Sequence, residues 1–210
     1  MFKDRLEAGK LLAAKLSMYR GKNDVIILGI PRGGVEVAYA IAKGLNSKLG
    51  IAVAKKIPFP GNPELAIGAV AFGGTASLDE SFLGSHGIGQ DYIDSEKRRL
   101  TSEIARRYKA YGAELPNVKG KIAVLVDDGM ATGHTVLAGA MALKKGKPKK
   151  LIVAVPVSSR QAAELLRIEA DEVLCLDVPE FFMSVGQFYR SFPQLTDEDV
   201  IDYLRQASSK

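Results

Sequence analysis

The stretch from residue 122 to residue 136, IAVLVDDGMATGHTV, constrains the fold of this chain more than any other part of it. Five apolar residues lead into Asp127 and Asp128, and a loop of small residues then opens an apolar run with helical spacing. This order predicts a buried parallel strand, a tight turn and the N-terminus of a helix. The two carboxylates would then lie at the carboxyl end of a strand, where open α/β sheets bind their ligands.

The chemistry of this turn points to a sugar phosphate. A strand-to-helix turn gathers unpaired backbone N–H groups and the positive end of a helix dipole, which together bind phosphate. Small loop residues let a ligand approach the backbone, and Thr132 and Thr135 add hydroxyl donors. Asp127 and Asp128 accept hydrogen bonds, so they suit the hydroxyls of a ribose. The alternative is an ordinary strand end with two solvated aspartates.

Strands and helices alternate along the rest of the chain. We expect strands at 24–30, 51–54, 121–126, 151–157 and 172–176, and helices at 3–19, 35–45, 93–111, 135–145, 160–168 and 196–207. This alternation predicts an α/β fold with a mostly parallel twisted sheet and helices on both faces. Residues 65–72 and 75–78 flank two glycines and predict a hairpin inserted over one edge of the sheet. We expect no regular structure at 57–63, which holds three prolines and a glycine, or at 80–93.

Composition indicates a soluble globular protein. The 210 residues suit a single domain, with a core at about 24–175 and a small hood and tail at about 176–210. Hydrophobic residues make up 47% and charged residues 25%, no apolar run reaches the roughly 18 residues of a membrane span, and the first ten residues lack the apolar core of a signal peptide. We therefore expect a cytoplasmic protein with no membrane partner.

Two other features of the composition exclude classes of function. Cys175 is the single cysteine, which excludes an intrachain disulfide and leaves no cysteine cluster for a metal. The net charge of +5 is compatible with an anionic substrate. The basic run at 146–150 carries no interleaved aromatic residues, so we read it as a solvated turn and do not expect a nucleic-acid partner.

Two further segments contain candidate site residues. In GIPRGGV, at 29–35, Arg32 and two glycines precede a helix, which predicts a second anion site; the alternative is a glycine-rich connection with a surface arginine. Phe181 and Phe182 belong to the aromatic segment LDVPEFFMSVGQFYR and are candidates for stacking on a heterocyclic base. The alternative for these two rings is packing of the hood against the sheet.

At 122–135 the chain resembles the signature of the type I phosphoribosyltransferases: apolar residues, two acids, glycine, an apolar residue and Ala-Thr-Gly-x-Thr. The resemblance implies the fold of that family, with Asp127 and Asp128 as the catalytic acids. It implies that the following loop and helix start bind the 5-phosphate, and this set comprises Gly129, Met130, Ala131, Thr132, Gly133, His134 and Thr135. His134 stands at a variable position of the signature, so we expect it to donate to phosphate or face solvent.

The turn at 29–35 and the lysine pair at 55–56 extend the resemblance. They imply a pyrophosphate site made by Pro31, Arg32, Gly33, Gly34, Lys55 and Lys56. Members of the family often have a cis peptide bond in this turn, which would be Pro31–Arg32 here. The basic pair would precede a mobile loop at 57–64 that closes over the site. The hood is similar to that of purine-type members, which implies contact of Phe181 and Phe182 with the acceptor.

The implied activity is Mg²⁺-dependent transfer of a 5-phosphoribosyl group from phosphoribosyl pyrophosphate to a nitrogenous acceptor such as a nucleobase, with release of pyrophosphate. Mg²⁺ would be held mainly by substrate oxygens, so no protein metal site is expected. The family also implies a homodimer. The alternative function is a non-catalytic regulatory or nucleotide-sensing protein of the same fold, which binds nucleic acid or a protein partner.

Overall fold

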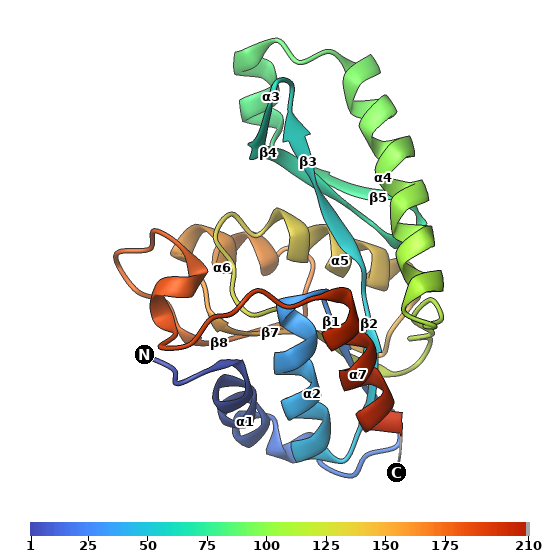
Figure 1. Cartoon of the computed structure of the whole chain (residues 1–210), viewed down its shortest axis with the longest axis vertical. Helices are drawn as coiled ribbons and strands as arrows, with labels where there is room; N and C mark the ends of the chain where they lie inside the picture. The colour runs from blue at the N-terminus through green and yellow to red at the C-terminus, as the bar shows by residue number, and fades with distance from the viewer. Residues whose placement is uncertain (209–210) are drawn as a thin grey trace.

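A five-stranded parallel sheet forms the centre of the computed structural model, which describes residues 1–208 apart from the side chain of Glu64 (Figure 1). The strand order is β2-β1-β6-β7-β8, and every neighbouring pair is parallel. The strands are β1 (Val25–Gly29), β2 (Lys48–Ile51), β6 (Ile122–Val126), β7 (Lys150–Val157) and β8 (Glu172–Asp177). Gly29 is paired with Val126, so β1 and β6 end together at one edge. The expected α/β fold with a mostly parallel sheet is confirmed.

Helices cover both faces of this sheet, because successive strand residues point to opposite sides. Ile27 and Val124 are buried in one apolar cluster with residues of α1 and α2, whereas Leu28 and Leu125 are buried in another with residues of α5 and α6. The bounds of these helices are α1 (Arg5–Lys15), α2 (Gly33–Leu45), α5 (His134–Lys145) and α6 (Arg160–Leu166). The continuous apolar runs of the sequence are therefore strands buried on both faces.

A second, antiparallel sheet forms a lobe that projects from the body of the molecule (Figure 1). It contains β3 (Ala54–Phe59), β4 (Asn62–Ala71) and β5 (Thr75–Leu78), and it is accompanied by α3 (Glu80–His86) and α4 (Gln90–Ala110). Alanine side chains join the lobe to α5, and this cluster comprises Ala54, Ala69, Ala71, Ala138 and Ala142. Small side chains at all of these positions let the helix approach the sheet closely.

The expectation that residues 57–63 lack regular structure is wrong, because Pro58 and Pro60 occupy positions that a hairpin tolerates. Phe59 is paired with Asn62, so Pro60 and Gly61 form a two-residue turn, with a φ of 78° at Gly61. Glycine adopts this conformation without steric cost. Pro58 lies between two register shifts of the β3–β4 ladder, an irregularity of the kind that accepts proline.

Two other boundaries also differ from the sequence-based expectation. The strand expected at 51–54 is two strands in different sheets, since β2 ends at Ile51 and β3 begins at Ala54. Residues 80–93 are not irregular, because α3 and the start of α4 fall within them. The Asp79 side chain accepts a hydrogen bond from the Phe82 backbone N–H at 3.0 Å and caps α3.

Both ends of the described chain pack onto the body: α1 contacts α2 and β7, and the C-terminal helix contacts α2 and β2. The C-terminal helix α7 (Asp197–Ser208) lies next to α2 (Figure 1). The backbone N–H of Phe2 donates to the carbonyl oxygen of Phe188 at 2.8 Å, and the N–H of Arg190 donates to that of Phe2 at 2.9 Å. The N-terminal residues therefore fix the segment after β8 to the body. Short 3₁₀ helices occupy Ser17–Tyr19, Phe72–Gly74 and Val185–Phe188.

Candidate active site

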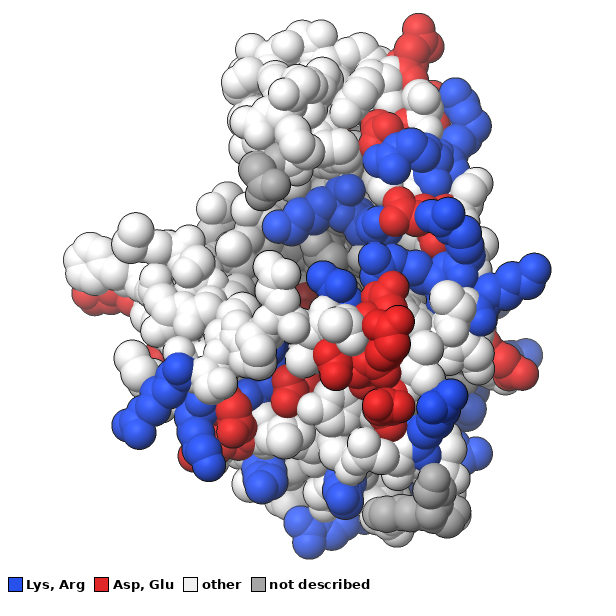
Figure 2. Space-filling view, viewed as in Figure 1, with Lys and Arg blue, Asp and Glu red and all other residues white. Residues whose placement is uncertain are grey.

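A cavity of about 530 Å³ opens where β1 and β6 end, at the base of the lobe. It is lined by Ile30, Pro31, Ala54, Lys55, Lys56, Leu65, Ala66, Arg107, Asp127, Asp128, Gly129, Met130, Ala131, Thr132, Gly133, Thr135, Val136 and Val185. Basic side chains gather around a hollow between the lobe and the body, and acidic side chains lie beside them (Figure 2). The volume suits a small-molecule ligand. The structure thus brings the acid pair, the loop after it and the lysine pair into one cavity.

Asp127 and Asp128 follow β6 directly and form part of the cavity wall. The Oδ1 atom of Asp127 accepts a hydrogen bond from the backbone N–H of Asp128 at 2.9 Å. Burial raises the pKa of both carboxyls, and for Asp127 the adjacent Asp128 charge raises it further. The positive charge of Arg5 opposes this rise in both, and that of Lys56 opposes it in Asp127. Two adjacent carboxylates held in this way attract hydrogen-bond donors such as sugar hydroxyls.

The first turn of α2 packs directly beneath the two acids. A Cβ atom on Gly34 would lie 2.7 Å from the carbonyl oxygen of Val126 and 2.8 Å from the Cα of Asp127. A Cβ atom on Gly33 would overlap the Asp128 carboxylate. Glycine at these two positions therefore lets the helix start approach the acids to a distance that a side chain would prevent.

Arg5 is a site residue that the sequence reasoning missed. Its Nε atom donates to Oδ2 of Asp128 at 2.8 Å, although 123 residues separate the two in sequence. Only 4% of Arg5 is exposed. The sequence did contain a sign of this role. Arg5 lies on the same helical face as the buried Leu12 and Leu16, and a charged residue on a buried face needs a partner of opposite charge.

The loop after the acids presents the open N-terminus of α5 to the cavity. Gly133 is the N-cap residue with a φ of 82°, and no side chain in residues 1–208 caps this helix. The N–H groups of the first helical turn have no partner inside the helix, and they share the positive end of its dipole. Thr132 is exposed at the cavity wall, and Thr135 is half-buried there. This end of the cavity can bind a phosphate.

Met130 and His134 both make contacts that fix the loop to neighbouring strands. Met130 is buried, its N–H donates to the carbonyl oxygen of Val157 at 2.9 Å, and its own carbonyl oxygen accepts from the Ser159 N–H at 2.9 Å. It therefore fastens the loop to the end of β7. The side chain of His134 lies against β5, with Nδ1 3.0 Å from Oγ of Ser77, and is absent from the cavity wall. The expectation that His134 faces phosphate or solvent is therefore wrong for its side chain.

The glycine-rich turn contributes less of its surface to the cavity than expected. The Pro31–Arg32 peptide bond is cis, as the resemblance implied. Pro31 lines the cavity, whereas Arg32, Gly33 and Gly34 do not. Arg32 is exposed at the N-cap of α2. The assignment of pyrophosphate to Arg32 and the two glycines therefore stays a prediction.

The basic wall of the cavity comes from the lobe. Lys55 and Lys56 lie on β3, and Arg107 lies on α4. Lys55 forms an ion pair with Glu103, which also comes from α4. Lys56 is exposed. Sequence reasoning missed Arg107, because the charged pattern of α4 gave no indication of which basic residue faces the cavity.

The two phenylalanines proposed for base contact do not line the cavity. Phe181 is 84% exposed. Phe182 packs against Phe188, with ring centroids 5.3 Å apart, within the apolar cluster that contains Phe2. For Phe182 this is the packing role that the sequence left open. Val185 is the residue of this segment that reaches the cavity.

Among the described residues 1–208, no group of three or more His, Cys, Asp or Glu residues could hold a metal ion. Within the same residues, every helix is too short or too polar to cross a membrane.

Comparison with known sequences identifies relatives of the whole chain. A family model described as the phosphoribosyl transferase domain matches residues 3–192. The Mycobacterium tuberculosis protein named "Putative phosphoribosyl transferase Rv0571c" is 37% identical over 209 residues. The match covers 99% of this chain and 47% of that protein, so the chain spans about half the length of this curated relative.

Comparison with solved structures identifies proteins that share the fold. The protein TT1426 from Thermus thermophilus is 38% identical, with a TM-score of 0.81 and 99% of each chain covered. The purine phosphoribosyltransferase of Pyrococcus horikoshii shares the fold at 19% identity, with a TM-score of 0.50 and 91% and 93% of the two chains covered. With the signature acids and the open helix start at one cavity, the chain belongs to the phosphoribosyl transferase domain family.

Proposed function

We propose that this chain is a phosphoribosyltransferase that uses phosphoribosyl pyrophosphate and Mg²⁺ to transfer a 5-phosphoribosyl group to a nitrogenous acceptor such as a nucleobase. One observation carries the proposal: a single cavity unites the acid pair, the uncapped start of α5 and the basic wall of the lobe. A ligand with a diol, a phosphate and a second anionic group matches these three parts. We include in this proposal a cytoplasmic homodimer.

The acid pair and the loop would bind the two ends of the ribose phosphate. Asp127 and Asp128 accept hydrogen bonds from the 2- and 3-hydroxyls. The N–H groups at the start of α5 and the hydroxyls of Thr132 and Thr135 donate to the 5-phosphate. Because these groups lie on rigid elements next to β6, the sugar is held with its anomeric carbon between the acids and the lobe.

The basic wall would bind the leaving group. Lys56 and Lys55 supply positive charge on one side of the cavity, and Arg107 adds a guanidinium that can bind phosphate with two parallel hydrogen bonds. Arg32 lies at the neighbouring start of α2 and completes the pyrophosphate site in this proposal. In this proposal the acceptor binds on the side of the cavity that Val185 lines, next to the segment that also contains Phe181 and Phe182.

In the proposed reaction the anomeric C–O bond breaks, and pyrophosphate leaves with the bonding pair. The ribose becomes oxocarbenium-like, as in glycoside transfer. The carboxylates of Asp127 and Asp128 place negative charge beside this developing cation and stabilise it. The lone pair of the acceptor nitrogen then forms the new C–N bond, and that nitrogen releases its proton. Movement of residues 57–64 over the cavity would exclude water and limit hydrolysis.

The described residues fit a metal ion that arrives with the substrate. Mg²⁺ keeps several waters and is bound largely through substrate phosphates in enzymes of this chemistry, so it needs no protein cage. When bound, the ion neutralises charge on the departing pyrophosphate.

Calorimetric titration with phosphoribosyl pyrophosphate and Mg²⁺ tests the sugar-phosphate site. We expect micromolar binding by the wild-type chain and its loss in the double variant Asp127→Asn/Asp128→Asn. A screen of acceptors by pyrophosphate release then tests transfer. Binding without turnover for any nitrogenous acceptor would favour the alternative of a nucleotide-sensing protein, and absence of binding would contradict the proposed function.

A further inference from the structure

Three contacts fix the side chain of Arg5 against the acid pair. Its Nε donates to Oδ2 of Asp128 at 2.8 Å, and its Nη1 donates to the carbonyl oxygen of Pro193 at 2.8 Å. Its guanidinium carbon lies 3.8 Å from the centre of the Phe192 ring. A buried, stacked guanidinium with two directed hydrogen bonds has little freedom to rotate.

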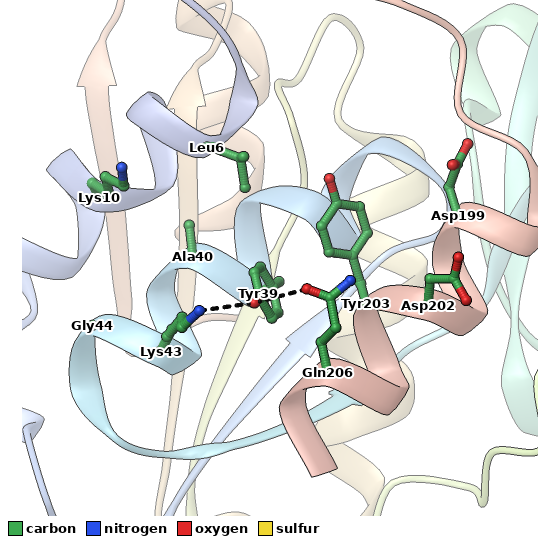
Figure 3. Close-up of a pocket in the computed structure, with 10 residues that line it drawn as sticks. All are labelled: Leu6, Lys10, Tyr39, Ala40, Lys43, Gly44, Asp199, Asp202, Tyr203 and Gln206. Carbon is green, nitrogen blue, oxygen red and sulfur yellow. Dashed lines mark hydrogen bonds between the residues drawn. The ribbon is translucent and has the colours of Figure 1, made fainter. Parts of the chain in front are cut away.

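A second carboxylate faces Arg5 from the other side. The Oε2 atom of Glu36 on α2 lies 3.8 Å from Nη1 of Arg5, and its Oε1 accepts a hydrogen bond from the Tyr203 hydroxyl at 2.9 Å. Tyr203 projects from α7 toward Tyr39 of α2, at the edge of a second cavity of about 690 Å³ (Figure 3). The shorter distance and the hydrogen bond make Asp128 the principal partner of Arg5.

The backbone of Asp128 is fixed as well. The hydroxyl of Tyr189 donates to its carbonyl oxygen at 2.6 Å. Arg5 holds Oδ2 of Asp128, and Asp128 lines the cavity. Oδ1 is the oxygen that remains for a ligand once Arg5 occupies Oδ2.

We infer that Arg5 is a positioning residue for Asp128: it binds Oδ2, directs Oδ1 to the ligand and offsets part of the negative charge of the acid pair. The part of this inference that concerns the ribose rests on the proposed function. The residues that fix Asp128 and Arg5 belong to α1, before β1, and to the segment after β8, so they lie outside the signature stretch. These two segments thus have a role at the site besides packing.

The charges around Asp128 define what removal of Arg5 would do. Arg5 faces it from α1, Asp127 precedes it, and the neutral hydroxyl of Tyr189 approaches from the C-terminal segment. Glu36 adds a negative charge behind Arg5. Lys55, Lys56 and Arg107 face the acid pair from the lobe side of the cavity. Without Arg5, Asp128 loses the one positive group that is hydrogen-bonded to it within residues 1–208, so its carboxyl would bind a proton at higher pH.

The first test needs no ligand. Carboxyl ¹³C signals of Asp128 are followed by NMR against pH in wild type, Arg5→Met and Arg5→Lys, with Lys15→Met as the control that removes an exposed charge from the same helix. We expect the Asp128 titration to move to higher pH in Arg5→Met and less in Arg5→Lys. Lysine keeps the charge but lacks the plane that stacks on Phe192, so it restores the effect only in part.

The second test measures binding and turnover at pH 6 and pH 8 with phosphoribosyl pyrophosphate and Mg²⁺. Loss of a hydrogen bond to a charged group corresponds to roughly tenfold or more in affinity. We expect Arg5→Met to weaken binding by about that factor at pH 6 and by less at pH 8, because a higher pH favours the ionised form of Asp128 in the variant. A structural role alone would lower stability without changing this pH profile.

The outcomes separate the inference from the proposed function. If wild type fails to bind phosphoribosyl pyrophosphate, the proposed function is overturned, and the NMR titration still decides whether Arg5 controls Asp128. If Arg5→Met and Arg5→Lys give the Asp128 titration and pH profile of Lys15→Met, the inference is overturned. Should Arg5→Met not fold, Arg5→Lys decides alone: an unchanged titration together with an unchanged pH profile overturns the inference.

Discussion

The Nδ1 atom of His134 lies 3.0 Å from the hydroxyl oxygen of Ser77, and this contact joins the first residue of α5 to β5. The Nε2 atom of the same ring lies 4.0 Å from Oδ2 of Asp79. Burial lowers the pKa of His134, and the nearby Asp79 opposes this only in part. The N-terminal end of α5 is therefore tied to the lobe through a titratable side chain.

This contact predicts a pH dependence of stability. The pKa of His134 is lower in the folded chain than its ordinary value of 6.5, so the unfolded chain takes up the proton first as pH falls. We expect the free energy of unfolding to decrease as pH falls below about 6.5, and to decrease less in His134→Gln. Urea unfolding at pH 7.5 and 5.5 measures this, with His86→Gln as the control. Equal losses in all three proteins would contradict the role of His134.

Asp128→Asn should lower turnover while the fold persists. Asparagine can still accept the hydrogen bond of Arg5 through its carbonyl oxygen, but the charge beside the developing cation is gone. We expect pyrophosphate release to slow by a factor on the order of 10², together with some loss of stability in urea, because the buried Arg5 keeps only the Glu36 carboxylate as a charged partner among residues 1–208. Asp177→Asn is the matched control, since Asp177 is exposed at the end of the parallel strand β8. Unchanged turnover would exclude the role given to the acid.

Thr132→Val should weaken binding of phosphoribosyl pyrophosphate. The hydroxyl of Thr132 lies on the cavity wall, and valine keeps its shape without the donor. We expect a loss of about 1–3 kcal/mol in binding free energy by calorimetry. Thr101→Val is the control, because that hydroxyl donates to the backbone of α4 at 2.7 Å and is absent from the cavity wall. Equal affinity in both variants would remove Thr132 from the phosphate site.

Gly34→Ala should disturb the fold and the acids together. The added Cβ would meet the backbone of Val126 and Asp127, which has no room to shift without moving β6. We expect the free energy of unfolding to fall by about 1–3 kcal/mol in urea. Gly84→Ala is the control, because a Cβ there meets nothing within 4 Å in α3, and alanine should stabilise that helix by roughly 0.5–1 kcal/mol. A neutral Gly34→Ala would refute the close approach of α2.

The sequence predicted those parts of the molecule whose structure depends on residues that are close together in the sequence. The run from Ile122 to Val126, the acids and the open start of α5 follow from apolar continuity and turn chemistry alone. The β3–β4 hairpin was missed because prolines argue against strands unless their place in the register is known, and Pro58 lies at a register shift. The short α3 was missed because its seven residues show no clear periodicity.

Contacts between distant segments account for the other differences. Arg5 and Asp128 meet only after α1 has packed on the sheet, and no local pattern links them. Which way a ring points is also set by tertiary packing: Phe182 lies on Phe188, whereas its neighbour Phe181 is exposed. The composition of the hood suggested base contact for both rings and could not distinguish them.

The position of α5 between the two sheets has a consequence for engineering this fold. Alanines of α5 pack on alanines of β3 and β4, and Lys145 in its last turn donates to Thr75 of β5 at 3.0 Å. The antiparallel sheet is thus mounted on the very helix that presents its N-terminus to the cavity. Exchange of the hairpin tip around Pro60 for another turn should leave the fold intact and change only the segment proposed to close over the cavity. Grafting the sheet as a whole should instead displace the start of α5 relative to the acids.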